Sequence, residues 1–214
     1  MASLWPNLKI ATQSQPQPER RFLALHLPRW ATDCLKRADP ALGTSARPLV
    51  LWEKQKGAMR LVAVDARASR HGLMAGQSLS DARAICPSLE AREIDRSFVE
   101  AVFASFADWH SYASPIVSVL TDRAAFGDLV LDITGVSHLF GGEPAMRDAV
   151  LDRLHRLGIT AAAAIAPTIG AAWALAHFRP GLVVDGNPAE ILAGLPVAAL
   201  RLDDLQVDGL NQMG

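Results

Sequence analysis

The sequence has little of what marks several large protein classes. Its 214 residues include only two cysteines, Cys34 and Cys86, too few for a disulfide framework and without the spacing of metal ligands. No apolar run approaches the roughly 20 residues that span a bilayer, and the first residues do not follow the signal-peptide pattern. The formal net charge is only −1. These absences predict a protein of the reducing cytoplasm with no membrane partner.

The common catalytic signatures are also missing. The chain contains neither of the glycine-rich phosphate motifs, G-x-x-x-x-G-K-[ST] and G-x-G-x-x-G, nor the G-x-S-x-G turn of serine hydrolases. None of the six histidines belongs to an H-E-x-x-H pair, which disfavours a zinc-hydrolase site. A classical phosphate loop and these two hydrolase classes are therefore not indicated.

What the chain does contain is enough apolar material for a core and an uneven distribution of charge. Half of the residues are hydrophobic and 20% are charged. Residues 44–92 hold eight basic and four acidic side chains, a net charge of +4, which leaves −5 on the remainder. A basic segment in an acidic chain indicates a polyanionic partner on one side. A merely solvated basic surface is an alternative of equal weight.

Turn residues and hydrophobic periodicity divide the chain into parts. Residues 1–20 include a Gln/Pro/Ser-rich run and are expected to form a disordered tail. Residues 21–40 and 93–187 alternate short apolar strands with helical patterns and predict a sheet with helices on one face. Residues 41–92 form an insertion with a β-hairpin and two short helices. Residues 188–214 are expected to form short helical pieces, at which we expect the chain to be truncated.

This order of elements predicts an α+β fold, a ferredoxin-like palm with an inserted subdomain. A long amphipathic helix is expected at residues 96–113, and Ser78 is expected to cap a short helix of the insertion. The strands of the palm are expected at residues 22–27, 116–120, 129–133, 159–166 and 182–184.

Carboxylates that could support metal-dependent chemistry are sparse. Two-metal phosphoryl transfer needs Asp or Glu from adjacent strands of such a palm, but the first strand offers His26 and Pro28. A later strand offers Asp128 and Asp132, which face the same side and lie about 13 Å apart. One carboxylate beside a histidine is a poor Mg²⁺ site, because this hard ion prefers oxygen ligands. We interpret Asp132 as a cap for the turn at Thr134.

Four segments resemble motifs of the Y-family translesion DNA polymerases, in the same order along the chain. They are residues 21–30, residues 62–87, residues 128–134 and residues 158–181. The resemblance covers roughly residues 21–200, and the run LDITGVSHLFGG points more narrowly to ImuB-like proteins, polymerase-like members of a bacterial mutagenesis cassette. It implies a Y-family palm, with residues 41–92 as small fingers and residues 188–214 as the start of a helical thumb.

Departures from the family's pattern fall on its catalytic positions. The resemblance places the first metal-binding aspartate at His26, the second acidic position of that strand at Pro28, and an Asp-Glu pair at Gly127 and Asp128. The residues that would hold the incoming triphosphate fall on Ala66, Ser69, Ile169 and Trp173. The resemblance therefore implies a catalytically inactive relative with no cofactor and no bound metal.

Basic side chains of the fingers-like segment remain available for DNA phosphates: Lys54, Lys56, Arg60, Arg67 and Arg70. The resemblance implies a DNA-binding adaptor in damage-induced (SOS) mutagenesis, located in the bacterial cytoplasm at the nucleoid. Its implied partners are an error-prone C-family DNA polymerase, the sliding clamp and a RecA-like accessory protein, contacted outside this fragment. One alternative is an active Y-family polymerase with an altered metal site of His26, Asp128 and Asp132. The other is an unrelated α+β enzyme or interaction domain.

Overall fold

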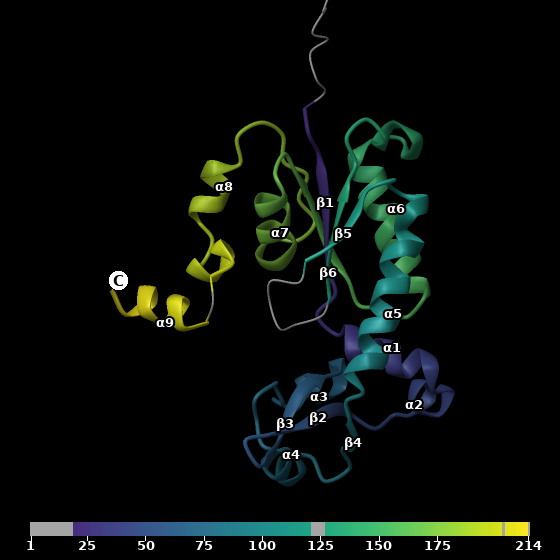
Figure 1. Ribbon diagram of the computed structural model, residues 1–214, viewed down its shortest axis with the longest axis vertical. Coiled ribbons are helices and arrows are strands. Elements are labelled where there is room, and N and C mark those ends of the chain that lie inside the picture. Colours follow the sequence, from purple (N-terminus) through teal and green to yellow (C-terminus); the bar gives the residue numbers. More distant parts are fainter. Residues whose placement is uncertain (1–18, 121–126, 203, 214) are drawn as a thin grey trace, which may run out of the picture.

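The computed structural model describes residues 19–120, 127–202 and 204–213, and Figure 1 shows that they form a larger and a smaller part. Most of the predicted tail lies outside the described residues. Arg20, which we placed in that tail, is described and donates a hydrogen bond of 3.1 Å to Asp132.

A four-stranded antiparallel sheet forms the centre of the larger part. Its strand order is β5-β6-β1-β7, and the strands are Val117–Val119, Asp128–Asp132, Phe22–His26 and Ala162–Ala166. In chain order this is 2-3-1-4, the arrangement of a ferredoxin-like palm. The predicted α+β palm is therefore confirmed. The last predicted strand is reduced to one bridge, between Ile165 and Val183.

Helices cover both faces of this sheet. They are α1 (Trp30–Ala38), α5 (Arg96–Trp109), α6 (Glu143–Arg156) and α7 (Ile169–Phe178). Because successive side chains of a strand point to opposite faces, β1 contributes to two cores. Leu23 and Leu25 pack with α1, α5 and α6, whereas Phe22 and Ala24 pack with α7. The prediction of helices on one face was wrong, and α7 covers the second face.

Helix α7 is apolar on all sides because it lies between two layers. Residues 171–176 are all buried, and four of these six residues are alanines. Beyond it the chain forms α8 (Ala189–Ala193), the 3₁₀ turn η3 (Val197–Leu200) and α9 (Asp204–Met213). Figure 1 shows α8 beside α7, on the side away from β1. A helix buried all round has no amphipathic stripe, so its sequence does not reveal which face of a sheet it covers.

The smaller part is built on a three-stranded sheet of order β3-β2-β4. The predicted hairpin is present as β2 (Leu49–Gln55) and β3 (Ala58–Val64). Lys56 and Gly57 have φ of 48° and 85°, the left-handed values that a two-residue hairpin turn needs. The remaining elements are α2 (Pro40–Thr44), α3 (Ala66–Arg70), α4 (Leu79–Ile85) and β4 (Glu90–Glu93), which runs parallel to β2.

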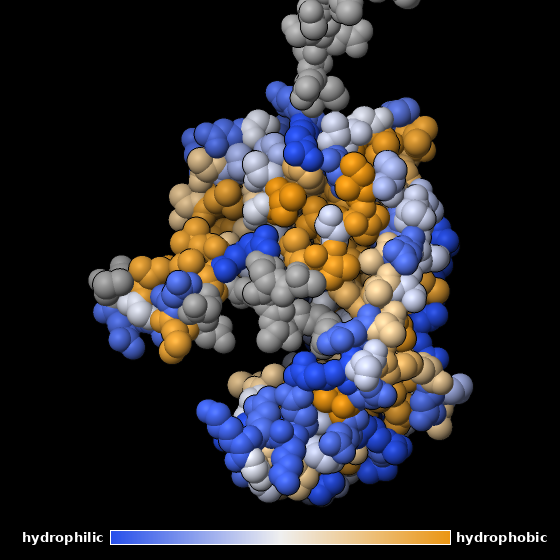
Figure 2. All heavy atoms as spheres, viewed as in Figure 1, coloured by the Kyte–Doolittle hydropathy of each residue, from blue (hydrophilic) through white to orange (hydrophobic). Residues whose placement is uncertain are grey.

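The two parts differ in surface character. Figure 2 shows the smaller part as mainly hydrophilic, whereas most of the exposed hydrophobic surface lies on the larger part. Two 3₁₀ turns, η1 (His110–Tyr112) and η2 (Ser137–Phe140), complete the larger part. Among the described residues, no helix is both long enough and apolar enough to cross a membrane.

Candidate functional site

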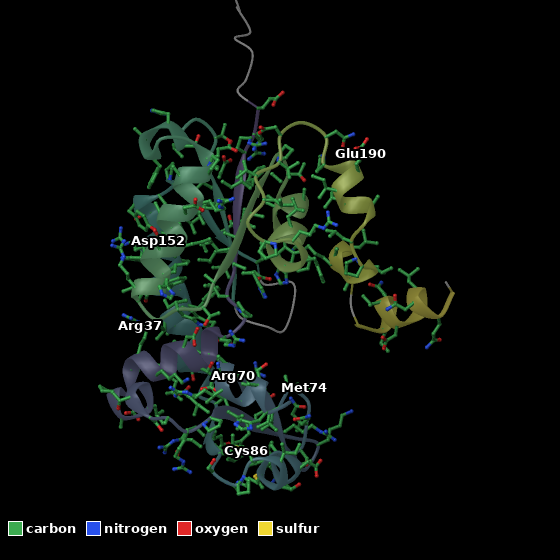
Figure 3. The ribbon with its side chains drawn as sticks, turned by 180° about the vertical axis from the view of Figure 1, so that it is seen from behind. Arg37, Arg70, Met74, Cys86, Asp152 and Glu190 are labelled. Atoms are coloured by element: carbon green, nitrogen blue, oxygen red, sulfur yellow. The ribbon has the colours of Figure 1, made fainter. Side chains whose placement is uncertain are left out.

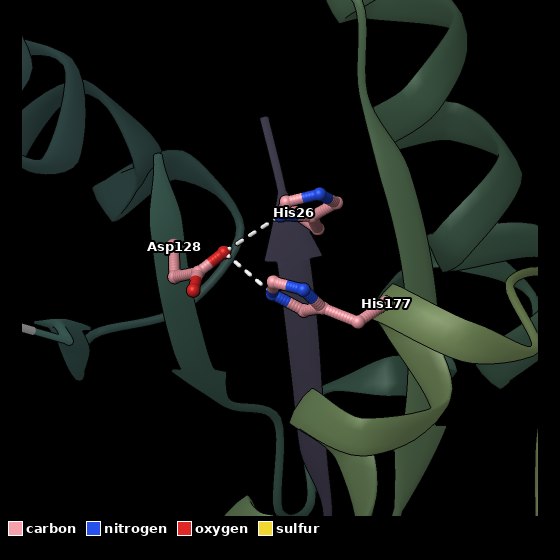
Figure 4. Close-up of side chains that lie close together, drawn as sticks. All are labelled: His26, Asp128 and His177. Carbon is pink, nitrogen blue, oxygen red and sulfur yellow. Dashed lines mark hydrogen bonds and ion pairs between the residues drawn. The ribbon is translucent and has the colours of Figure 1, made fainter. Parts of the chain in front are cut away.

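Asp128 lies at the centre of a side-chain cluster where β1, β6 and α7 meet. The antiparallel register pairs His26 directly with Asp128. The Oδ1 atom of Asp128 is 2.9 Å from His26 Nδ1 and 2.9 Å from His177 Nε2, as Figure 4 shows. Its Oδ2 atom accepts a 2.8 Å hydrogen bond from the indole N–H of Trp173. Three elements that are distant in sequence therefore converge on one carboxylate.

The surroundings of Asp128 keep it ionised. Burial alone would raise its pKa, since the side chain is only 13% exposed. The hydrogen bonds from His177, His26 and Trp173 outweigh burial and hold the pKa of Asp128 far below its usual range. The two imidazole rings lie against each other, with centroids 3.6 Å apart and planes at 33°. The result is a compact unit of one carboxylate and two stacked imidazoles.

His177 is the residue of this cluster that the sequence did not single out. It lies four residues after Trp173 on α7, so one helix face presents both side chains to Asp128. By resemblance, Trp173 stands where a polymerase has a residue that holds the triphosphate. In the structure Trp173 is only 2% exposed, and its indole ring is hydrogen-bonded to the Asp128 carboxylate. The i, i+4 spacing of Trp173 and His177 is the signal that could have linked them.

Gly127 leaves no space for the carboxylate that the resemblance places there. Its φ is 126°, which side chains rarely adopt, and its carbonyl accepts a 2.6 Å hydrogen bond from the Leu27 N–H. A Cβ atom at this position would lie 2.5 Å from the Leu27 carbonyl oxygen. An aspartate at 127 would therefore require a different backbone path.

The residues present do not fit the Mg²⁺ ions that the polymerase fold implies. Mg²⁺ is held by oxygen ligands in near-octahedral geometry, whereas this cluster offers one carboxylate with two imidazole nitrogens. The alternative metal set of His26, Asp128 and Asp132 is wrong, because Asp132 pairs with Phe22 at the opposite end of the two strands. Asp132 instead accepts the Thr134 N–H at 3.0 Å, as the predicted turn cap.

The other predicted triphosphate positions lie on two helices, α3 and α7. Ala66 is the first residue of α3, and Ser69 is on the same short helix. Ile169 is the first residue of α7 and is 38% exposed. The side chains of alanine and isoleucine have no hydrogen-bond donor for a phosphate group, and a serine side chain supplies no positive charge.

A buried ion pair joins the two parts of the molecule close to these positions. Asp65 is fully buried, caps α3 by accepting the Ala68 N–H at 2.7 Å, and pairs with Lys36 of α1. Burial raises the pKa of Asp65, but the hydrogen bonds from Ala68 and Lys36 prevail and leave the pKa below its usual value. The orientation of α3 relative to the palm is therefore fixed by a charged contact.

A pocket between the two parts has a volume of about 180 Å³ and is lined by Pro28, Arg29, Trp30, Val62 and Ala63, among other residues. Small-molecule sites usually enclose about 300–1,000 Å³. Pro28, on which the second acidic position of the family falls by resemblance, is exposed at the edge of this pocket.

The predicted DNA-binding side chains are not equivalent. Lys54, Lys56 and Arg70 are exposed, and within the described part of the chain none of the three forms an ion pair. Figure 3 shows Arg70 on the side of the smaller part nearest the palm. Arg60 is exposed but donates to the Gly76 carbonyl at 2.8 Å. Arg67 is half-buried and donates to the Ser45 carbonyl.

Two acidic residues of the smaller part are neutralised from outside residues 44–92. Asp65 pairs with Lys36, and Glu53 accepts two hydrogen bonds from Arg96 at 2.8 and 2.9 Å. The pKa of Glu53 falls to about 2 as a result of these bonds. Of the four acidic residues in residues 44–92, these two already pair with cations from elsewhere in the chain. The surface around the exposed hairpin lysines is therefore more positive than the net charge of residues 44–92 alone indicates.

The antiparallel palm and the small inserted sheet have the fold of the Y-family DNA polymerases. The chain belongs to the impB/mucB/samB family, whose model matches residues 26–177. It is 43% identical over 145 residues to the protein ImuB of two strains of Caulobacter vibrioides. That match covers 67% of this chain and 31% of the relative, so the chain corresponds to about a third of those proteins.

Solved structures confirm the fold. An insertion ternary complex of Dbh DNA polymerase matches with a TM-score of 0.70 at 17% identity, over 91% of this chain and 58% of that one. DinB from Sulfolobus solfataricus matches with a TM-score of 0.66 at 17% identity, over 91% of this chain and 57% of that one. At this level of identity the similarity concerns the fold alone.

Proposed function

We propose that this chain is the polymerase-like region of a DNA-binding adaptor in damage-induced mutagenesis, and that it does not transfer nucleotides. The observation that carries the proposal is the composition of the cluster around Asp128. Where a polymerase palm needs several carboxylates, this palm has His26, Gly127 and Asp128, and the one carboxylate among these three residues is already bonded to His26, His177 and Trp173.

Nucleotide transfer has requirements that the described residues do not meet. Phosphoryl transfer depends almost entirely on positioning and on neutralising charge with metal ions held by oxygen ligands. One carboxylate cannot hold two Mg²⁺ ions, and the backbone at Gly127 excludes a second carboxylate beside it. The uncharged side chains of Ala66 and Ile169 lie where the resemblance expects groups that hold the triphosphate.

DNA binding is supported by the exposed cations of the smaller part. Lys54 and Lys56 flank the tip of the β2–β3 hairpin, and Arg70 ends α3 on the side nearest the palm. Contacts from such side chains to phosphates give affinity that depends on salt and not on sequence. This is the kind of binding that an adaptor on damaged DNA requires.

The family relationship supports the proposed adaptor role. We propose that the whole protein joins an error-prone C-family DNA polymerase, the sliding clamp and a RecA-like accessory protein at the bacterial nucleoid. The 43% identity to ImuB supports this placement in a mutagenesis system. Because the matched region is 31% of that relative, the surfaces that contact these partners are expected mainly outside this chain.

Primer extension measured beside DNA binding tests the proposal. The purified chain should bind primer–template DNA in an anisotropy assay, and so should the full-length protein that contains it. Neither protein should extend the primer, whether Mg²⁺ or Mn²⁺ is supplied. A Y-family polymerase active under the same conditions is the positive control. Extension by the wild-type protein that is lost in Asp128→Asn would overturn the proposal in favour of an active enzyme with an altered metal site. Absence of DNA binding by the full-length protein would overturn the DNA-binding part.

A further inference from the structure

The cluster that is poor for Mg²⁺ has the composition of a different kind of metal site. One nitrogen from each of His26 and His177 and one oxygen of Asp128 all lie within 4.8 Å of one another. Two imidazoles and one carboxylate are a typical ligand set for Zn²⁺ and for neighbouring divalent transition metals. Neutral imidazole suits these borderline-soft ions, whereas Mg²⁺ and Ca²⁺ select oxygen.

The spacing of the three groups is close to that of ligands sharing one ion. Zinc–nitrogen and zinc–oxygen bonds are about 2.0–2.2 Å long, which places two ligands of a tetrahedral ion about 3.3 Å apart. Each imidazole nitrogen is 2.9 Å from the same carboxylate oxygen, so small side-chain rotations convert the hydrogen-bonded arrangement into a coordinating one. In that conversion the ring nitrogen that faces Asp128 must carry no hydrogen, so its hydrogen moves to the other nitrogen of the same ring or is released to water.

The surroundings hold these ligands in place. Asp128 and His26 lie on paired strands whose backbone is fixed by the sheet, and His177 lies on a helix packed against that sheet. The indole N–H of Trp173 bonds the second oxygen of Asp128 at 2.8 Å, as outer hydrogen bonds orient ligands in metalloproteins. The side chains of the three ligands are 13–25% exposed, which leaves access for an ion and for a further ligand.

We propose that His26, Asp128 and His177 bind one divalent transition-metal ion of the zinc class, with at least one coordination position left open. The ion would link β1, β6 and α7. It would replace the Mg²⁺ pair of a polymerase palm by a single ion with a structural role. The proposal does not rest on DNA binding or on the adaptor role, because its readout is metal stoichiometry and stability.

Direct metal measurements on the untagged chain test this site. After the metal is removed by chelation, the chain is incubated with excess Zn²⁺ and dialysed to remove unbound ion. We then expect one Zn²⁺ per chain by mass spectrometry of the metal content, and a rise in the thermal midpoint when Zn²⁺ is added to the metal-free chain. Mg²⁺ at the same concentration should produce neither effect. Co²⁺ should give the visible absorption of a nitrogen–oxygen site, without the near-ultraviolet band of a bound thiolate from Cys34 or Cys86.

Three variants locate the ion. His177→Gln should lower Zn²⁺ affinity at least about tenfold, and Trp173→Phe should lower it about 10- to 100-fold by freeing the carboxylate. His138→Gln, an exposed histidine on η2 near the opposite end of the sheet, is the matched control and should bind like wild type.

Two outcomes would contradict the proposed metal site. Equal Zn²⁺ affinity of wild type and His177→Gln, with both folded by circular dichroism, would place the ion elsewhere and overturn the proposal. Wild type that takes up no Zn²⁺ or Co²⁺ at micromolar concentration would show that the cluster is only a hydrogen-bonded unit. If His177→Gln does not fold, the Co²⁺ absorption spectrum of wild type and the Zn²⁺ affinity of Trp173→Phe still test whether the ion binds at this cluster.

Discussion

The carbonyl oxygen of Leu27 lies 2.5 Å from the position that a Cβ atom of Gly127 would occupy. A main-chain hydrogen bond of 2.6 Å from the Leu27 N–H to the Gly127 carbonyl holds the two segments together. By resemblance, position 127 corresponds to a metal-binding aspartate of the polymerases. The space for its side chain is occupied by the main chain of Leu27, and side-chain rotations cannot open it.

We expect Gly127→Ala to lower the free energy of unfolding by about 3 kcal/mol, because it combines a disfavoured φ with a steric conflict. Gly135→Ala is the matched control, since Gly135 also has a positive φ, 73°, but open space around it. It should cost about 1 kcal/mol. Urea denaturation measures both values, and equal losses would contradict the steric argument. For the same reason the double variant His26→Asp/Gly127→Asp should show no primer extension.

Removing the two hairpin lysines should weaken DNA binding through electrostatics alone. For Lys54→Ala/Lys56→Ala we expect the slope of log K against log salt to fall in magnitude by about two, roughly one per lost phosphate contact. Fluorescence anisotropy between low and moderate salt measures the slope. Arg156→Ala, an exposed arginine of α6 on the palm, is the control and should leave the slope unchanged. An unaltered slope in the double variant would identify the hairpin as a solvated surface.

Arg67 and Arg70 lie three residues apart on α3 but should behave differently. Arg67 donates to the Ser45 carbonyl, so Arg67→Ala should cost about 1 kcal/mol of stability and leave the salt slope unchanged. Arg70 is exposed, so Arg70→Ala should change the slope by about one and stability by less than about 0.5 kcal/mol. Urea denaturation measures the stability and fluorescence anisotropy measures the salt slope. A changed slope in Arg67→Ala and an unchanged slope in Arg70→Ala would show that Arg67 is the phosphate contact.

The buried pair of Asp65 and Lys36 should make stability depend on pH in the acid range. The pKa of Asp65 is lower when folded than when unfolded, so its contribution is complete above about pH 4, the unfolded value, and is lost as pH falls below it. Asp65→Asn should therefore lose more stability, relative to wild type, at pH 6 than at pH 3. Urea denaturation at both values measures this difference.

The partner residue supplies the control for that measurement. Lys36→Met leaves a buried carboxylate without its cation and should cost about 3–5 kcal/mol at pH 6. The double variant Asp65→Asn/Lys36→Met should lose less than the sum of the two single changes, because the residues are coupled. Additive losses would show that the pair contributes no interaction energy.

The elements that local patterns specify were predicted from the sequence. Residues 22–27 form a strand because they are an apolar run ended by Pro28, and the structure has β1 at Phe22–His26. Ser78 caps α4 by accepting the Asp81 N–H, as the sequence indicates. Strand β4 was missed because Glu90–Glu93 has no apolar alternation, and backbone pairing with β2 alone makes it a strand.

The site was only half predicted, and for a topological reason. His26 and Asp128 follow from the pairing of β1 with β6, which an expected palm already contains. His177 joins them only because α7 covers the second face of the sheet. The sequence of α7 does not reveal this face, because the helix is apolar on all sides apart from His177. The exposed or bonded state of Arg60 and Arg67 likewise depends on loops that no local pattern specifies.

The alanines of α7 have a consequence for how this protein can vary. Ala171, Ala172 and Ala176 pack against Ala24, Ala164 and Ala166 of the sheet, so the helix approaches the strands as closely as methyl groups permit. A valine at one of these positions would push the helix outward and withdraw both His177 and Trp173 from Asp128. The geometry of the polar cluster thus depends on residues that have no polar atoms in their side chains. Substitutions of the alanines at this interface would therefore alter the contacts of Asp128 with His177 and Trp173 even if all residues of the cluster were retained.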